Sequence, residues 1–120
     1  MAKILYLGTN GSEKPTKSVF PFQWANAAVE AGHQAEIYLF GDAVVLMKDA
    51  VANSVVPIGW PPLKEILTTT IRKHIPIYVW GACSSARGVT EDDLKDKNAR
   101  FSNTQEFAEH TAIADRVVSI

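Results

Sequence analysis

Cysteine is the rarest residue in this chain, whose 120 residues include a single one, Cys83. One cysteine cannot close a disulfide within the chain, and no Cys/His cluster has the spacing of a metal site, so we expect neither a metal nor another cofactor. No apolar run approaches the roughly 18–20 residues that a membrane helix needs, and the first residues lack the pattern of a secretory signal. We therefore expect a cytoplasmic protein with no membrane partner.

An excess of charge of one sign is also lacking. Twelve Lys and Arg residues are balanced by thirteen Asp and Glu residues, which leaves a net charge of −1. Without a basic surplus to neutralise phosphates, we expect no nucleic-acid partner. His33, His74 and His110 stand apart with no motif around them, so we expect structural or solvent-facing roles for all three. The length is usual for one domain, and we expect a single domain over 1–120.

The chain does contain an alternation of strand-like and helix-like segments. Continuous apolar runs predict buried strands, and apolar residues at helical spacing predict helices. The expected strands cover 3–8, 35–40, 75–80 and 116–120, and the expected helices cover about 18–31, 42–52, 62–74 and 104–114. This order predicts an α/β fold, a three-layer α/β/α sandwich around a mainly parallel sheet. The mixed charges of 84–100 indicate a solvated loop or a short helix.

Two of the expected helices carry start signals. In the first, Ser18 would be the N-cap, which places Pro21 in the first turn, where a missing N–H is tolerated. In the last, Asn103 and Glu106 have the spacing of a capping box. The expected apolar face of the first helix consists of Phe20, Trp24, Ala27, Ala28 and Ala31.

The stretch "GSEKPTKS", 11–18, nearly matches a phosphate-binding P-loop. Thr16 stands where the motif has its second glycine, and a β-branched residue resists the backbone geometry that wraps the phosphates. We therefore do not expect nucleotide hydrolysis. Thr9, Asn10 and Ser12 remain candidates to line a site at the carboxyl edge of the sheet, and a plain polar loop is the alternative.

Cys83 directly follows the strand 75–80, at the sheet edge where parallel folds bind ligands. We expect the next residues, including Ser84 and Ser85, to form a helical turn whose N–H groups favour a thiolate. Arg87 would add a positive charge, and Gly88 would end the turn in a left-handed conformation. Such a thiol can act as a nucleophile or carry sulfur. The alternative is a buried cysteine that packs as a small hydrophobe, and the local sequence leaves both readings open.

The segment "IPIYVWGACSSARG", 75–88, resembles the DsrE/DsrF-like family, also called YchN-like. The similarity lies in a strand that begins near a proline, a cysteine just after it, and Arg-Gly four and five residues further on. The tail "FAEHTAIADRVVSI" is similar to the closing helix and strand of that family, and "KILYLGTNGSE" is similar to its opening. The resemblance covers nearly the whole chain, most closely 1–42 and 75–120.

The resemblance implies a five-stranded parallel sheet and assembly as a homo-oligomer, a trimer or hexamer. It also implies that sulfur is held as a persulfide on Cys83 and passed between a protein donor and a protein acceptor, with positioning roles for Arg87 and Gly88. Some relatives have a second cysteine three residues earlier, where this chain has Trp80. A disulfide or a sulfur handover within one chain is therefore excluded.

Three classes of function stay open on the sequence. The first is a small sulfur carrier or sulfurtransferase-type protein that acts through Cys83. The second is a non-catalytic oligomeric binding or assembly protein on the same fold, and the third is a small-molecule site at the carboxyl ends of the strands. A domain of this size need not bury every large apolar side chain, and exposed patches mark interfaces, so we expect some of these side chains at an interface; packing in the core is the alternative. The candidates for such a patch are Phe20, Phe22, Trp24 and Trp60.

Overall fold

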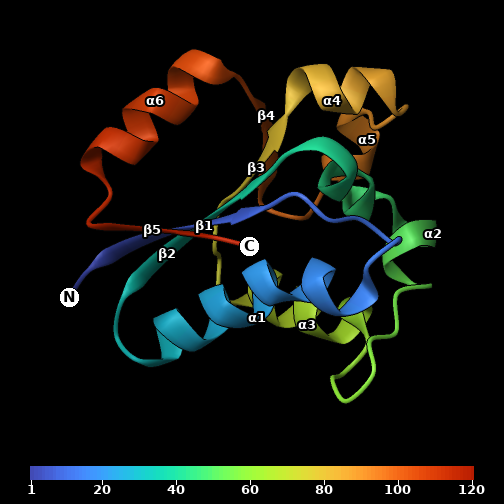
Figure 1. Cartoon of the computed structure of the whole chain (residues 1–120), viewed down its shortest axis with the longest axis horizontal. Helices are drawn as coiled ribbons and strands as arrows, with labels where there is room; N and C mark the ends of the chain where they lie inside the picture. Colours follow the sequence, from blue (N-terminus) through green and yellow to red (C-terminus); the bar gives the residue numbers. More distant parts are fainter.

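Five parallel strands form one sheet in the order β4-β3-β2-β1-β5. The computed structural model describes residues 1–120, and helices lie on both faces of the sheet (Figure 1). The strands are β1 (Lys3–Gly8), β2 (Gln34–Leu39), β3 (Ile77–Trp80), β4 (Ala99–Ser102) and β5 (Arg116–Ser119). The predicted α/β/α fold with a five-stranded parallel sheet is confirmed.

The long helices divide between the two faces. Figure 1 shows α1 (Pro15–Glu30) and α3 (Leu63–Arg72) together on one face, and α6 (Thr104–Ile113) on the other. Shorter helices follow β2 and β3. They are the 3-10 helix η1 (Gly41–Met47), α2 (Asp49–Ala52), α4 (Gly81–Ala86) and α5 (Glu91–Leu94). No helix is both long and apolar enough to span a bilayer.

Two unequal cores result, because successive side chains of a strand point to opposite faces. Ile37 and Leu39 of β2 belong to the large core of 22 buried residues that also contains Phe22 of α1 and Leu67 of α3. Tyr38, between them in β2, belongs to a second cluster of three buried residues, with Leu5 and Tyr78. Helix α6 contributes no buried residue to this second cluster, so this face of the sheet is the less completely covered one.

The structure corrects two predictions for the first helix. It begins at Pro15 rather than at Ser18, because proline suits the first helical position. Pro21 therefore lies inside the helix, where it is buried close to Gly8, and a Cβ on Gly8 would come within 2.8 Å of the proline Cγ. The expected apolar face is only partly correct: Ala28 is buried, and Phe20 and Trp24 are partly buried against the core, but Ala27 and Ala31 are exposed. Apolar residues occur all around this helix, so spacing alone did not select the buried stripe. The buried residues are Ser18, Val19, Pro21, Phe22, Ala25, Asn26 and Ala28.

Other boundaries differ less. The segment expected as one helix over 42–52 is η1 followed by α2, and the helix expected over 62–74 is α3, with Pro62 as its N-cap. The strand expected over 75–80 begins at Ile77. The polar segment 84–100 contains the predicted short helix, α5, but also the start of β4, a strand that the sequence pattern did not reveal because it is short and mixed in character.

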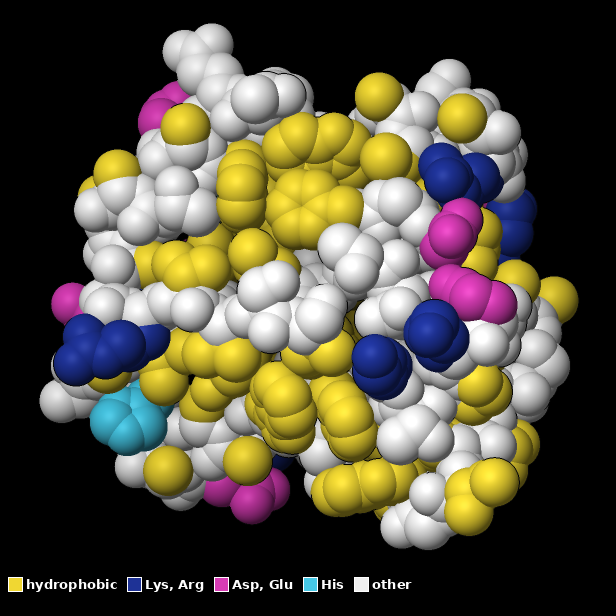
Figure 2. Space-filling model, viewed as in Figure 1, with side chains coloured by type: hydrophobic (Ala, Val, Ile, Leu, Met, Phe, Trp, Pro, Cys, Tyr) yellow, Lys and Arg dark blue, Asp and Glu magenta, His cyan; other side chains and the backbone are white.

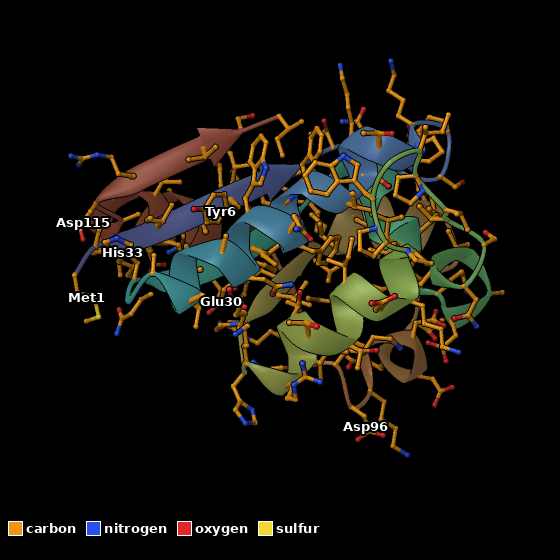
Figure 3. All side chains as sticks on the ribbon, turned by 90° about the horizontal axis from the view of Figure 1, so that it is seen from below. Met1, Tyr6, Glu30, His33, Asp96 and Asp115 are labelled. Carbon is orange, nitrogen blue, oxygen red and sulfur yellow. The ribbon has the colours of Figure 1, made fainter.

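The start of β1 is held by two side chains from distant parts of the chain. The Ala2 N–H donates to His33 Nδ1 at 2.9 Å, and the Lys3 N–H donates to Asp115 Oδ2 at 2.7 Å. Figure 3 shows His33 and Asp115 at the same end of the molecule, near Met1. The edge strand β5 is thereby fixed beside β1, and the carboxyl ends of all five strands point toward the opposite end.

Candidate functional site

Cys83 lies at the carboxyl edge of the sheet, as predicted. Strand β3 ends at Trp80, and α4 begins with the next residue, Gly81. The helix starts earlier than expected, so Cys83 is its third residue rather than the residue before it. No side chain caps this helix, and the cysteine is a free thiol in a partly buried position. The side chain packs against the edge of the large core, which holds the turn against the sheet.

The hydrogen bonds of Arg87 are with the backbone of α4 and with Asp42. Its Nη1 donates to the carbonyl oxygen of Cys83 at 3.2 Å, and its Nε donates to Asp42 Oδ1, also at 3.2 Å. This contact is with the backbone of Cys83, and the expected effect of the Arg87 charge on the thiol stays a prediction. Gly88 has a φ of +70°, as expected for a left-handed helix end, and the Val89 N–H reaches back to the Ser84 carbonyl at 2.9 Å.

The two serines after the cysteine differ in their surroundings. Ser85 is exposed, whereas Ser84 is 1% exposed and its Oγ has no hydrogen-bond partner. A buried hydroxyl without a partner costs about 1–3 kcal/mol. We therefore expect an alanine at this position to make the turn more stable, and neither serine forms a hydrogen bond with the sulfur.

Asp42 brings the loop after β1 close to the cysteine turn. The loop packs on η1 so closely that a Cβ at Gly11 would collide with the Asp42 carbonyl oxygen, while the Asp42 carboxylate holds Arg87. Of the predicted loop residues, Thr9 and Ser12 are exposed and Asn10 is half-buried. The sequence-predicted residues therefore gather along one edge of the sheet, with Asp42 as a link that sequence reasoning did not identify.

The near-match to a P-loop contains Ser18, whose hydroxyl is engaged with the helix backbone. Ser18, which occupies the metal-binding position of that motif, is buried and donates its hydroxyl proton to the Pro15 carbonyl at 2.8 Å. That hydroxyl serves the first turn of α1. The absence of nucleotide hydrolysis at this loop stays an expectation from the sequence.

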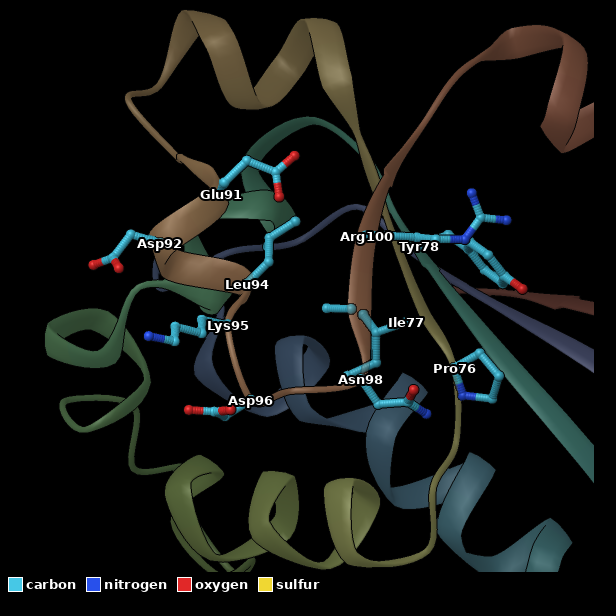
Figure 4. Close-up of a pocket in the computed structure, with 11 residues that line it drawn as sticks. Pro76, Ile77, Tyr78, Glu91, Asp92, Leu94, Lys95, Asp96, Asn98 and Arg100 are labelled. Carbon is cyan, nitrogen blue, oxygen red and sulfur yellow. The ribbon is translucent and has the colours of Figure 1, made fainter.

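The largest hollow, of about 700 Å³, lies elsewhere. Figure 4 shows it beside the edge strand β4, between α5 and the side chains of Tyr78 and Arg100. Pro76, Ile77, Asn98 and Ala99 in its wall stand at the amino ends of β3 and β4. Small molecules bind parallel sheets beyond the carboxyl ends, and no residue of the Cys83 turn lines this hollow. It therefore gives no support to a small-molecule site at the predicted edge.

A polar network between the sheet and α6 was missed by sequence reasoning. Tyr38 Oη lies 2.9 Å from Ser102 Oγ and 2.7 Å from His110 Nδ1. Ser102 Oγ also donates to Glu106 Oε1 at 2.6 Å, and Arg100 binds the second carboxylate oxygen at 2.7 Å. The only sequence signal was Glu106 at the third position after Asn103. Asn103 does cap α6 by accepting the Glu106 N–H at 2.9 Å, but the Glu106 carboxylate turns to Ser102 and Arg100 instead of completing a capping box.

The network shifts two acidities in opposite directions. Burial raises the pKa of Tyr38 to about 12, so the phenol stays protonated at neutral pH. The Ser102 hydroxyl, with help from Arg100, lowers the pKa of Glu106, so that carboxylate stays ionised. Around the network, the rings of Phe40, Trp80 and Phe107 contact one another, with centroids 4.6 to 5.7 Å apart.

The same fold occurs in solved structures from two bacteria. The YchN protein from E. coli superimposes with a TM-score of 0.81 at 19% identity, and the match covers 100% of both chains. BT1422, a conserved protein of unknown function from Bacteroides thetaiotaomicron, gives a TM-score of 0.70 at 14% identity, covering 99% of this chain and 95% of that one. At these identities the likeness establishes the fold alone. No curated protein matches the sequence.

The family of the chain is shown by its sequence. Residues 2–120 match the DsrE/DsrF-like family, so the match spans all five strands and the Cys83 turn. This family is associated with sulfur relay in general. Because the match extends over nearly every residue, the chain belongs to the DsrE/DsrF-like family.

Proposed function

We propose that this chain is a small sulfur carrier that holds a persulfide on Cys83. The observation that carries the proposal is the position of the only thiol, which is partly exposed in the first turn of α4 at the carboxyl edge of the sheet. Arg87, the C-cap of this helix, donates a hydrogen bond to the Cys83 carbonyl, and Gly88 follows in a left-handed conformation. A carrier needs an accessible thiol on a rigid element, and it needs neither a general base nor a metal.

The transfer is two thiol exchanges. The Cys83 thiolate attacks the outer sulfur of a donor persulfide, the S–S bond of the donor breaks, and the donor leaves as a thiolate. An acceptor thiolate then attacks the outer sulfur on Cys83, and Cys83 leaves as a thiolate in turn. No electrons are gained or lost overall. Because the chain has no second cysteine, donor and acceptor thiols both come from partner proteins.

Intact-mass spectrometry after brief exposure to a persulfide donor at neutral pH tests the proposal. Wild type is expected to gain one or more sulfur atoms and Cys83→Ser none. A matched control moves the thiol two positions along the same helix, in the double variant Cys83→Ser, Ser85→Cys, because Ser85 is exposed. The relocated thiol is expected to load more slowly despite its exposure, because it lies two residues farther from the start of α4, where backbone N–H groups favour a thiolate. An unmodified wild type that is folded would remove the carrier proposal and leave the assembly function.

We also infer that copies of this chain associate, as trimers or hexamers. The support is the poorly covered side of the sheet: three of the four β5 residues are exposed, with Val117 at 46%. Figure 2 shows the side of the molecule where β5 runs, with apolar side chains in two groups: one in the notch between α6 and α4, and one over α1, on the other face of the sheet. On α1, the rings of Phe20 and Trp24 are stacked and only partly buried, and Trp60 packs edge-on against Phe20.

Light scattering coupled to size exclusion tests the association. Val117→Lys is expected to shift the protein toward the monomer, because a charge would be placed in an apolar interface. Ile113→Lys, on α6, has a similarly exposed starting residue, at 62%, and shows whether the interface extends beyond β5. A wild type that runs as a monomer at every concentration contradicts the proposal.

A further inference from the structure

The two hydroxyl groups of the Tyr38 network have one proton each but take part in three hydrogen bonds, and this fixes the direction of each hydrogen bond. Its members are Glu106, Ser102, Tyr38 and His110, joined in that order by distances of 2.6, 2.9 and 2.7 Å. Glu106 also binds Arg100, and a carboxylate in an ion pair can only accept. A hydroxyl has one proton to donate, so the direction chosen at Glu106 determines the remaining contacts.

The donor of each hydrogen bond can be assigned in turn, starting from the Glu106 carboxylate. Ser102 donates its only proton to Glu106, so its oxygen must accept from Tyr38. Tyr38 then donates its only proton to Ser102, so its oxygen must accept from His110. The hydrogen bond between Tyr38 Oη and His110 Nδ1 therefore exists only if Nδ1 carries a proton. A neutral His110 in this position carries that proton on Nδ1 and none on Nε2.

We propose that His110 is held in the Nδ1–H tautomer by this directed chain, and that its unprotonated Nε2 is a proton-accepting site on the α6 side of the sheet. The site takes a group that donates a hydrogen bond, such as a hydroxyl, thiol or ammonium group. Tyr38, Ser102 and Glu106 are positioning residues that act through His110. This site is separate from the Cys83 turn and does not depend on the sulfur-carrier proposal.

The surroundings leave the site available. Nε2 has no hydrogen-bond partner in the protein, and it is not fully buried, because His110 is only partly buried. The imidazole packs against two rings, with centroids 5.6 Å from Tyr38 and 4.6 Å from Tyr78. Tyr78 gives its hydroxyl proton to Glu36 and carries Arg100 over its ring. Among the four members of the network, the charged group is Glu106, which lies on the same helix as His110.

The other two histidines provide internal references. His33 Nδ1 accepts the Ala2 N–H at 2.9 Å, so a neutral His33 must carry its proton on Nε2, the opposite tautomer. His74 is exposed and forms no side-chain hydrogen bond, so its tautomers are free to exchange. One protein therefore holds three histidines with three different expected states.

Nuclear magnetic resonance of the ¹⁵N-labelled protein, with two-bond proton–nitrogen correlations recorded where the histidines are neutral, tests the tautomer. The unprotonated ring nitrogen resonates far downfield of the protonated one. The downfield nitrogen is expected to be Nε2 in His110 and Nδ1 in His33. A downfield Nδ1 in His110, or averaged shifts like those of His74, would overturn the proposal.

Three variants test the chain that fixes the tautomer. In Ser102→Ala, Tyr38 loses its acceptor and turns its proton to His110 Nδ1, so the tautomer is expected to reverse. Tyr38→Phe removes the acceptor of the Nδ1 proton and is expected to shift His110 toward Nε2–H. Tyr78→Phe keeps the ring against His110 and is expected to change nothing. An unreversed tautomer in folded Ser102→Ala would contradict the directed chain.

Acylation of imidazole by diethyl pyrocarbonate tests the accepting site itself, because the reagent needs an accessible unprotonated nitrogen. Peptide mapping after brief treatment of the folded protein is expected to show a modified His110 along with the exposed His74. In Ser102→Ala, the modification of His110 is expected to slow because Nε2 then carries the proton. A wild type with a modified His74 and an untouched His110 would overturn the accessible site.

Discussion

The carboxylate of Asp42 and the guanidinium of Arg87 form an ion pair at 3.2 Å that joins the turn after β2 to the end of the cysteine helix. The two residues are 45 positions apart in sequence. Both side chains are substantially exposed, at 62% and 34%, and exposed pairs contribute little to stability because water screens them. The main effect of the ion pair is on geometry, because it holds the Arg87 side chain in a fixed position at the carboxyl end of α4.

Arg87→Ala is therefore expected to cost less than about 1 kcal/mol in unfolding free energy. Persulfide loading of Cys83 is expected to survive, because the guanidinium contacts the Cys83 carbonyl rather than the sulfur. Urea unfolding and intact-mass spectrometry measure the two effects. A complete loss of loading in folded Arg87→Ala would show that the guanidinium acts on the thiol directly.

Ser84→Ala is expected to stabilise the protein by about 1 kcal/mol, since it removes a buried hydroxyl without a partner. Ser85→Ala is the matched control on the same helix, and it should leave stability nearly unchanged because Ser85 is exposed. Thermal and urea unfolding of both variants measure the difference. If Ser84→Ala is destabilising, the hydroxyl has a partner in solution.

Gly88→Val is expected to destabilise the protein by about 1–2 kcal/mol, because Gly88 has a φ of +70° and a β-branched residue resists that conformation. A Cβ there would meet no other atom within 4 Å, so the cost is backbone strain alone. Gly88→Asn should cost less, since asparagine tolerates the left-handed region. Equal losses in the two variants would argue against a backbone origin.

Stability is expected to fall in alkali because the pKa of Tyr38 is raised to about 12 from 10.0 by burial. Below pH 10 the phenol is protonated in both the folded and the unfolded chain, so the full stability is present. Between about 10 and 12 the unfolded chain loses this proton first, and the unfolding free energy decreases. Urea unfolding at pH 9 and pH 11 is expected to show a steeper decrease for wild type than for Tyr38→Phe.

The parts of the fold that could be predicted from the sequence are those with a single dominant pattern. The runs "KILYLG" and "AEIYLF" are apolar on both sides, as central parallel strands must be. Helix α3 buries Leu63, Ile66 and Leu67 on one clear stripe. Helix α1 has apolar residues all round, so the buried stripe was decided by packing against the sheet rather than by spacing. Strand β4 was missed because its four residues have no clear period.

The candidate site shows the same division. Cys83 and Gly88 were placed by local rules, the end of a buried strand and the left-handed end of a helix. The partner of Arg87 could not be placed in this way. Asp42 follows a different strand, β2, and its distance from Arg87 depends on how η1 packs. The Tyr38 network draws on β2, β4 and α6, and no short window of sequence contains enough of it to be recognised.

The order of the strands also bears on how the chain reaches this structure. Strand β1 lies between β2, which follows it closely in sequence, and β5, whose anchoring contact from Asp115 to Lys3 spans 112 positions. Closing so long a loop is slow, so a partly folded chain keeps one edge of β1 open while β5 is still undocked. An open edge pairs readily with other chains. Refolding at low protein concentration should therefore give the highest yield of native protein. At high protein concentration, partly folded chains should aggregate by pairing through the open edge of β1.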